Sequence, residues 1–545
     1  MAQASLGAGG VTDVHAARLF NGSCLALTSG SVMFAVTGDI MGVLKQQFIL
    51  DNAQIALIMS GGSWGFISAM FILGPLCDAL GMRRLLYFAC FSQALGILLM
   101  ILAGTGLLAL VGGGSSAFAC GMLFAGTLIN GLGSGAVEAV CNPLIATIYP
   151  DKKTHKLSQF HMWFPGGIVI GGLIVYLFTH INLNYWQLKL AVPLLPTAAY
   201  GIMFIREHFP VTERVQAGVS FGGMFKETLL RPLFLVLLVC MLMTASLELG
   251  PMRWIPAVLE AGGIPGILVL VWVTGFMAVL RLFCGPVVKV LTNTGLLLLS
   301  ATVAGVGLLL LSFPASIVVV GLTATVFAFG VCYFWPAMLG TVAERVPKGG
   351  ALALAIIGGT GSLFVGAVTA PVMGWIADKY LHQELVFRGT VDGKAFDRET
   401  ETAALLKEVQ TAYTGWRATL SDSKKDQITK GEIDEVLKST AQVLETQQTA
   451  RALPEPDTAN ALRVAIKNGP PDALPDSAPA ATKEALAAKK KAGAVLNPAD
   501  NKGGLMSFRW VSAVSIVLVI VFGIMFIQDR RRRGYRAEKI VTDQA

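Results

Sequence analysis

Long apolar segments alternate with short polar connections along most of the 545-residue chain. A helix needs about 20 mainly apolar residues to cross the hydrocarbon core of a bilayer. Twelve segments meet this requirement, with centres near residues 32, 64, 94, 132, 168, 197, 245, 275, 304, 331, 365 and 518. The pattern predicts an all-α membrane protein with twelve transmembrane helices.

The charges between these segments predict the orientation. Connections on one side collect lysines and arginines, among them Lys152, Lys153 and Arg214, whereas the short loops on the other side hold almost none. Cytoplasmic loops are enriched in these residues. We therefore expect a multi-pass protein of the cell (inner) membrane with both termini in the cytoplasm.

The chain divides into two similar parts. Matching features recur in the same order, for example Pro143 in the fourth segment and Pro336 in the tenth, and internal repeats are typical of transporters. We predict an N-terminal six-helix half (1–207), a cytoplasmic linker (208–231), helices 7–11 of a C-terminal half (232–380), and helix 12 with a basic cytoplasmic tail (506–545).

A polar segment, residues 381–505, separates helices 11 and 12. Its first part has helical periodicity, whereas residues 452–500 are rich in Pro, Ala, Lys and Asp, a composition typical of disorder. The number of preceding spans places it outside the cytoplasm. We predict a polar extracytoplasmic insertion that is partly helical and partly disordered.

Composition excludes several classes of function. Only 14% of the residues are charged, whereas a soluble domain carries roughly 25%. The net charge of +8 arises from short basic runs beside apolar segments, so no nucleic-acid partner is expected. The cysteines have no CxxC spacing and no ATP-binding loop occurs, so we expect no metal, no cofactor, no ATP-driven pump and no enzyme.

One short sequence after the second segment points to a family. GPLCDALGMRR, from Gly74 to Arg84, resembles the G-x-x-x-D-(R/K)-x-G-x-(R/K)-(R/K) signature of the major facilitator superfamily, with Ala79 in place of the usual basic residue. The resemblance implies the major facilitator fold of two six-helix halves.

The same sequence predicts a gate. We expect Asp78 to pair with Arg83 or Arg84 and to hold the two halves together in one state. The proposed cytoplasmic gate comprises Gly74, Asp78, Gly81, Arg83 and Arg84. The alternative is a topology anchor without a gating role.

Three further segments resemble the fucose:proton symporter family. They run from Gly38 to Phe48, from Glu138 to Pro143 and from Leu157 to Gly166. The resemblance implies that Asp39 and Glu138 serve sugar binding and proton coupling. It also implies that polar residues of the fifth segment contact the sugar, although Met162 occupies the position of that family's asparagine.

Charges at bilayer depth are functional candidates because each costs about 2.5–3.5 kcal/mol to insert. Asp39 is either a coupling carboxyl or a carboxylate capped by a neighbouring helix. Glu138 shares a helix face with Asn142, next to Pro143, and glycines in this stretch allow close helix approach. The alternative for Glu138 is a structural hydrogen bond between helices.

Four other positions are less sharply defined by the sequence. Gln159 and His161 lie at the start of the fifth segment. Each could belong to a gate, contact the solute, or form the polar start of the helix. For Glu248 the alternatives are a gate, a solute contact and a simple ion pair with Arg253. Trp335 either offers a flat apolar face to a sugar or packs in the core. Arg281 is expected to reach the membrane surface as an anchor.

These observations favour a secondary active transporter that imports a monosaccharide with protons by alternating access. The substrate and coupling residues are Asp39, Glu138, Asn142, Gln159, His161, Glu248 and Trp335. The expected partners are a small solute, a coupling cation with H⁺ favoured over Na⁺, and the lipid bilayer, and we expect a monomer. The alternatives are a proton-driven exporter of drug-like or organic solutes and Na⁺-coupled sugar uptake.

Overall fold

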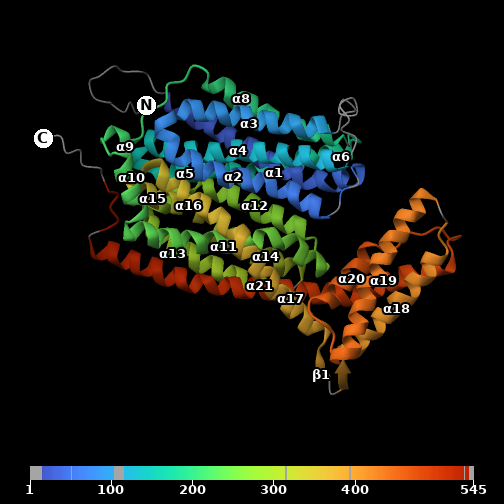
Figure 1. Ribbon diagram of the computed structural model, residues 1–545. Helices are drawn as coiled ribbons and strands as arrows, with labels where there is room; N and C mark the ends of the chain where they lie inside the picture. The colour runs from blue at the N-terminus through green and yellow to red at the C-terminus, as the bar shows by residue number, and fades with distance from the viewer. Residues whose placement is uncertain are drawn as a thin grey trace.

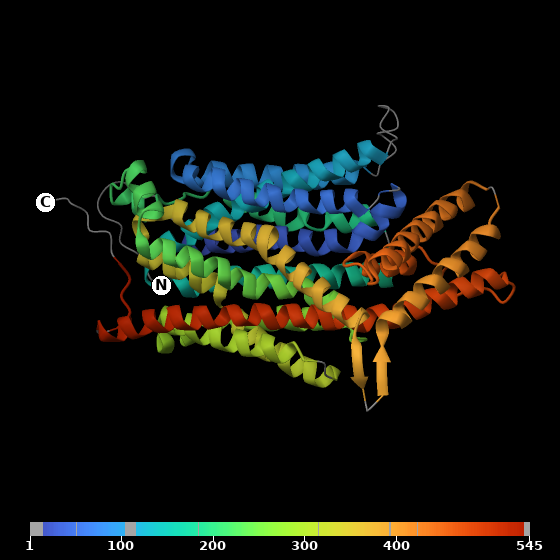
Figure 2. The same cartoon turned by 60° about the horizontal axis from the view of Figure 1, so that its bottom comes forward.

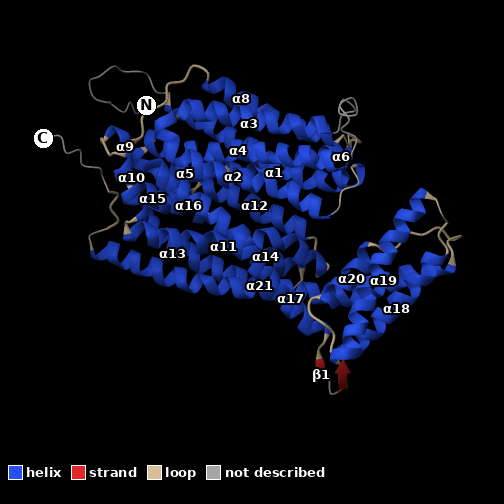
Figure 3. Ribbon diagram, in the orientation of Figure 1, coloured by secondary structure: helices blue, strands red, loops and turns tan. Residues whose placement is uncertain are grey.

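The structure is a computed structural model that describes residues 15–48, 50, 52–103, 116–183, 185–313, 316–391, 394–421, 423–532 and 534–538. Long helices lie side by side in one bundle, and a smaller group of helices projects from one end of it (Figures 1 and 3). We call this the insertion end. The opposite end, where α9 (Glu213–Gln216) and α10 (Phe221–Leu229) lie, is the linker end.

The first half of the bundle is built around α4. Its elements are α1 (Ala16–Gln47), α2 (Asn52–Leu80), α3 (Met82–Ala103), α4 (Ser116–Ile148), η2 (Pro150–Lys152), α5 (Lys153–His161), α6 (Trp163–His180), α7 (Trp186–Ala191) and α8 (Leu194–Phe204). Helix α4 packs against α2 and α3, and α1 packs against α6 and α8.

The second half is completed by the last helix of the chain. Its elements are α11 (Pro232–Ala261), α12 (Gly266–Leu282), α13 (Cys284–Leu311), α14 (Ile317–Val331), α15 (Phe334–Arg345), η3 (Pro347–Gly349), α16 (Gly350–Phe364), η4 (Val365–Thr369), α17 (Ala370–Leu385) and α21 (Ala480–Arg531). Helix α21 packs along α11, α13 and α17 (Figure 2).

The predicted membrane helices are confirmed in type, and ten helical segments of the described residues are long and apolar enough to cross a bilayer. The predicted span near residue 275 is the shorter helix α12, with 17 residues. The span near residue 197 is divided into α7 and α8 around Val192 and Pro193, because proline lacks the N–H that would continue the helix. The count of twelve therefore stays a prediction.

Glycines allow α4 to lie unusually close to its neighbours, as the sequence predicts. A Cβ atom on Gly131 would stand 2.2 Å from the Gly62 carbonyl oxygen, and one on Gly135 would stand 2.3 Å from that of Phe66. Any larger side chain would push α2 away. Helix α4 is therefore fixed at the centre of the first half, with Glu138 on it.

Apolar side chains also cover the outside of the bundle. Leu195, Val318 and Ile516 are each more than 60% exposed. Water-soluble monomers rarely expose large continuous apolar patches, whereas a lipid-facing surface consists of them. The bundle is therefore built for a bilayer.

The insertion has a hydrophobic core of its own. It contains the antiparallel strands β1 (Arg388–Val391) and β2 (Lys394–Asp397), then α18 (Arg398–Ala418), α19 (Lys424–Ala450), α20 (Asp457–Lys467) and the first part of α21. Leu406, Val409, Tyr413, Val436 and Leu462 are buried together in it.

Residues 452–500 differ from the sequence prediction, because they contain α20 and the start of α21 where disorder was expected. Ala485, Ala488, Ala492 and Ala499 form a buried stripe at the spacing of one helix face. Alanine has the highest helix propensity, and its small side chain lets α21 approach α18. A composition typical of disorder is here the small-residue face of a packed helix.

Candidate functional site

Glu138 lies near the middle of α4 and is 6% exposed. The Asn142 side chain, one turn further along the same helix, donates a hydrogen bond from Nδ2 to Glu138 Oε2 over 2.8 Å. The shared face that the sequence predicted is thus confirmed. The amide satisfies one carboxylate oxygen without supplying a countercharge.

His161 completes this cluster from the end of α5. Its Nε2 lies 2.9 Å from Asn142 Oδ1, and its Nδ1 lies 3.8 Å from Glu138 Oε1. Because Asn142 Nδ2 donates to Glu138, Asn142 Oδ1 is the acceptor for His161, and Nε2 carries a hydrogen. His161 Nδ1 therefore faces the carboxylate of Glu138.

Glu248 on α11 pairs with Arg281 on α12, with Arg281 Nη2 3.0 Å from Glu248 Oε1. Both side chains are under 5% exposed, so the expectation that Arg281 reaches the membrane surface is wrong. Arg253, the partner considered from the sequence, is exposed. The second carboxylate oxygen of Glu248 is buried and has no close hydrogen-bond partner among the described residues, and the main-chain N–H of Trp335 also faces this carboxylate.

Arg281 also joins the two halves. Its Nη1 donates to the main-chain oxygen of His161 over 2.9 Å, and its Nε donates to that of Cys332 over 2.6 Å. The main-chain oxygen of Arg281 in turn accepts from Ser158 Oγ on α5. One guanidinium thus connects α5 of the first half to α11 and α14 of the second.

The resulting cluster has an unusual charge balance. Glu138, His161, Glu248 and Arg281 are all buried. Two carboxylates stand against one permanently charged guanidinium and one imidazole that is charged only when protonated. An uncompensated charge is expensive in a low-dielectric interior. The cluster is therefore neutral only when it holds one additional proton.

Asp39 stands apart from this cluster. Its Oδ2 accepts from Lys189 Nζ on α7 over 2.8 Å, and Lys189 also donates to Thr179 Oγ1 over 3.0 Å. The Lys189 side chain is 8% exposed and that of Asp39 is 36% exposed. Asp39 is therefore paired with a lysine of a neighbouring helix, and its part in coupling stays a prediction.

Gln159 and Trp335 also occupy different surroundings. Gln159 Oε1 accepts from Lys156 Nζ over 2.9 Å and so faces the linker end rather than Glu138. Trp335 begins α15 and is 9% exposed, with its ring edge 3.7 Å from the position that a Cβ on Gly358 would occupy. The tenth segment is divided just before Pro336, because α14 ends at Val331 and α15 starts at Phe334.

Asp78 is held by the linker and not by its own motif. Its Oδ2 accepts from Arg214 Nε over 2.9 Å and from Arg214 Nη2 over 2.6 Å, and its Oδ1 accepts from Thr212 over 2.7 Å. Arg83 instead donates to the main-chain oxygen of Ile205. The expected pairing of Asp78 with Arg83 or Arg84 is therefore replaced by an ion pair in which two nitrogens of Arg214 donate to one oxygen of Asp78.

The remaining residues of the motif shape the end of α2. Gly74 lies where α2 meets α16 of the other half, because a Cβ there would stand 2.1 Å from that of Ala355. Gly81 has a φ of +85° and ends the helix, a conformation that favours glycine. Arg84 is exposed.

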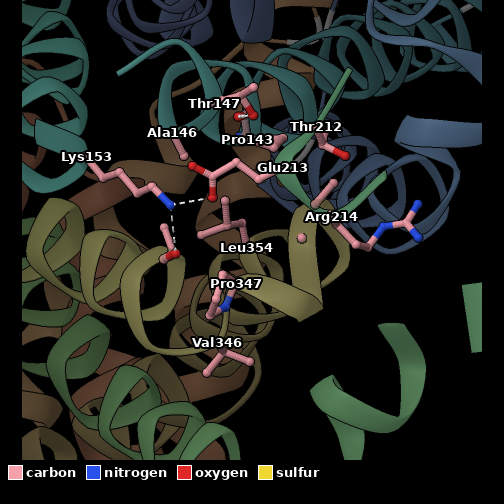
Figure 4. Close-up of a pocket in the computed structure, with 13 residues that line it drawn as sticks. Pro143, Ala146, Thr147, Lys153, Thr212, Glu213, Arg214, Val346, Pro347 and Leu354 are labelled. Atoms are coloured by element: carbon pink, nitrogen blue, oxygen red, sulfur yellow. Dashed lines mark hydrogen bonds and ion pairs between the residues drawn. The ribbon is translucent and has the colours of Figure 1, made fainter. Parts of the chain in front are cut away.

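A second ion pair at the linker end joins both halves to the linker. Lys153 Nζ on α5 lies 2.6 Å from Glu213 Oε2 and donates to the Ala343 main-chain oxygen of α15 over 3.3 Å. Figure 4 shows these contacts beside a pocket that Pro143 and Thr147 also line. The pocket volume of about 30 Å³ holds no more than a water molecule or two. Because Lys153 also joins α5 to α15 and to the linker, the linker end is closed at these residues.

Four cationic residues of these sites were not predicted as site residues. They are Lys153, Lys189, Arg214 and Arg281. The sequence showed that each lies near an apolar segment, but not which carboxylate it meets. Within the described residues no group of three or more His, Cys, Asp and Glu side chains could hold a metal ion.

Similar folds occur among solved transporters. The fucose:proton symporter FucP of E. coli matches with a TM-score of 0.54 at 14% identity, covering 66% of this chain and 92% of that one. The proton:xylose symporter XylE matches with a TM-score of 0.55 at 15% identity, covering 68% and 90%. The human organic anion transporter MFSD10 (TETRAN) matches with a TM-score of 0.50 at 13% identity, covering 67% and 94%.

Comparison of the sequence with known proteins and protein families identifies the family. No curated protein matches the chain significantly. The model of the Major Facilitator Superfamily, however, matches residues 19–371, which is well over half of the 545 residues. The matched region includes α2 with its Asp78 motif and every member of the buried cluster. The chain is therefore a multi-pass membrane transporter, not an enzyme, and belongs to the Major Facilitator Superfamily.

Proposed function

We propose that this protein imports a monosaccharide together with protons by alternating access. The observation that carries the proposal is the buried cluster of Glu138, Asn142, His161, Arg281 and Glu248, which lies where the two halves meet and is neutral only with one extra proton. Transporters of this architecture bind substrates near the bilayer midplane at the interface of their repeats.

The proton has a defined place in this cluster. When His161 is neutral, the lone pair of Nδ1 faces Glu138 Oε1 at 3.8 Å, and the two repel if Glu138 is ionised. A proton on either group turns this repulsion into attraction and shortens the distance. Glu138 and His161 thus form one proton-binding unit, positioned by Asn142 on one side and by Arg281 on the other.

A hydroxylated solute suits the second half of the site. The second oxygen of Glu248 is a buried acceptor without a close donor among the described residues, and a buried acceptor that lacks a close donor is costly. A sugar hydroxyl would satisfy it. Trp335, whose main-chain N–H faces the Glu248 carboxylate, would cover an apolar face of the sugar with its ring. The fold similarity to the fucose:proton symporter FucP and the proton:xylose symporter XylE is consistent with this class of solute.

The proposed orientation places the linker end in the cytoplasm and the protein in the inner membrane. Basic residues gather at this end, among them Arg84, Lys152, Lys226 and Lys348, in agreement with the enrichment of cations in cytoplasmic loops. The ion pairs of Asp78 and Lys153 then act as a cytoplasmic gate in its closed state. A closed linker end corresponds to an outward-facing transporter.

The test is the pH of a lightly buffered suspension of de-energised cells that express the protein, after addition of each of a panel of sugars. External alkalinisation with one sugar identifies proton symport and the solute class together. If sugar uptake requires Na⁺ and causes no pH response, the coupling ion is Na⁺ and not H⁺. If no sugar is taken up, the proposal fails in favour of an exporter.

A matched pair of variants locates the proton. Glu138→Gln removes the titratable carboxyl but keeps the hydrogen bond from Asn142, and it should abolish the alkalinisation. Asp39→Asn removes a carboxylate that already has a lysine partner, and it should retain the alkalinisation. Proton symport that survives in Glu138→Gln would overturn the assignment.

A further inference from the structure

The chain beyond α21 returns across the linker end. Asn293 Nδ2 on α13 donates to the Tyr535 hydroxyl over 3.1 Å, and the guanidinium of Arg345 lies 4.4 Å from the centre of the Tyr535 ring. Three residues later, the Glu538 N–H donates to the Glu344 main-chain oxygen over 2.8 Å. The Glu538 carboxylate accepts from Arg231 over 2.5 Å, so Tyr535–Glu538 is anchored at both ends.

Tyr535 is anchored in the joint between the two halves. Asn293 Nδ2 also lies 2.7 Å from Thr154 Oγ1 on α5 and 2.9 Å from Glu344 Oε2. Thr154 in turn donates to Glu344 Oε1 over 3.1 Å. These bonds hold α5 of the first half against α13 and α15 of the second half. Tyr535 therefore contacts the residues that must separate when the linker end opens.

The neighbouring contacts make this joint compact. A Cβ on Gly340 would lie 2.1 Å from Thr154 Oγ1, and one on Gly285 would lie 2.8 Å from the His155 ring. Thr292, next to Asn293, has a φ of +62°, a strained conformation for a β-branched residue. Strained residues of this kind persist only where the surroundings hold them and are common at switch regions.

The Tyr535 hydroxyl keeps its proton at physiological pH. Burial and the neighbouring Glu344 carboxylate raise the pKa of Tyr535 well above its ordinary value. The hydroxyl can therefore donate to Glu344 while it accepts from Asn293. Glu344 is thus linked to both Thr154 of the first half and Tyr535 of the tail.

We propose that residues 535–538 form a strap that stabilises the closed linker end and so slows its opening. The strap adds no residue to the solute site. It shifts the balance between the two states of the transporter towards the outward-facing one. The proposal rests on the alternating access proposed above, but not on the identity of the solute or the coupling ion.

Cys284 provides a direct measurement of opening. It is fully buried at the start of α13, beside Ser158 of α5, and it becomes accessible only if α5 moves away. The other seven of the eight cysteines would be replaced by alanine in the full-length protein in nanodiscs. The rate of reaction of Cys284 with a water-soluble maleimide then measures the population of the open state.

Two truncations form a matched pair. A chain that ends at Glu538 keeps the strap, and a chain that ends at Gly534 loses it. We expect the shorter chain to react about tenfold faster, the change that corresponds to losing one hydrogen bond to a charged group. The chain ending at Glu538 should react at the rate of the full-length protein. Equal rates for the two truncations would overturn the strap.

Substitutions in the full-length chain keep the test valid if the shorter chain does not fold. Tyr535→Phe removes the hydroxyl but keeps the ring on Arg345, and Tyr535→Ala removes both. We expect the labelling rate to rise from the unmodified protein to Tyr535→Phe and further to Tyr535→Ala. A rate unchanged by Tyr535→Ala would also rule out the strap. Since labelling needs no sugar and no proton gradient, failure of the proposed transport function would leave this result interpretable.

Discussion

Asp39 and Glu138 are two carboxyl groups of the first half that the sequence assigned to the same task, yet their surroundings differ. Asp39 is about one-third exposed and forms an ion pair with Lys189. Glu138 is buried against an amide and an imidazole, with no cation in hydrogen-bond contact. An ion pair is already neutral, whereas Glu138 and His161 need a proton to become so. The partner of an acidic residue, more than its type or its depth, decides whether it can carry a proton.

The largest expected effect is that of Glu138→Gln on coupling. Without its titratable carboxyl the protein should still exchange labelled sugar across the membrane, but the accumulation ratio should fall to about 1, because the coupling free energy between sugar and proton is lost. Counterflow and proton-driven uptake in the same vesicles distinguish the two activities. Accumulation by Glu138→Gln that still varies with pH would contradict the contrast drawn above.

A second effect should appear in stability when Arg281 is replaced. Arg281→Gln leaves Glu248 buried without its cation, and breaking a buried pair in this way costs about 3–5 kcal/mol. The double variant Arg281→Gln with Glu248→Gln removes both charges and should recover most of the loss. Thermal unfolding of the purified proteins measures both. A double variant no more stable than the single one would show that Arg281 acts mainly through the main-chain oxygens of His161 and Cys332.

Lys189→Gln should have a smaller effect. Because Asp39 is partly exposed, loss of its partner should destabilise the protein by no more than about 1 kcal/mol, and proton-driven accumulation should persist. Uptake measured over a range of external pH checks both statements, with Asp39→Asn as the matched control. Lys189→Gln could also abolish accumulation while Asp39→Asn retains it. This result would mean that Asp39, once it has lost its ion-pair partner, competes with Glu138 for the coupling proton.

The smallest effect is expected at Asp397, whose carboxylate is exposed to solvent. Asp397 caps α18, and hydrogen bonds from the backbone and hydroxyl of Thr400 lower the pKa of Asp397. Its stabilisation is therefore present above the ordinary carboxyl pKa of about 3.9 and is lost as the pH falls through the lowered value. Asp397→Ala should weaken hydrogen-exchange protection at the start of α18 near neutral pH. The unmodified protein should show the same weakening only in strong acid.

The sequence predicted the features that depend on local patterns. Apolar length located the membrane helices, and the glycines of α4 indicated its close packing. Asn142 and Glu138 were placed on one face because they are four residues apart. Each of these conclusions follows from residues within one helix.

The cations of the site could not be predicted in the same way. Lys189 meets Asp39 across 150 positions of the chain and Arg214 meets Asp78 across 136. Arg281 resembled a surface anchor because it lies in the last turn of a short apolar helix. Only the packing of α12 against α5, α11 and α14 makes it a buried residue, and that packing is not encoded in local periodicity.

Helix α21 has a mechanical consequence. Its 52 residues correspond to roughly 78 Å at the helical rise, and Arg463 ties its outer part to α17 through Asp378 and Asp500. Fixed to the second half in this way, the outer segment would follow a rocking of that half and enlarge it at its tip. A fluorophore on α19 is expected to report this rocking as an optical signal.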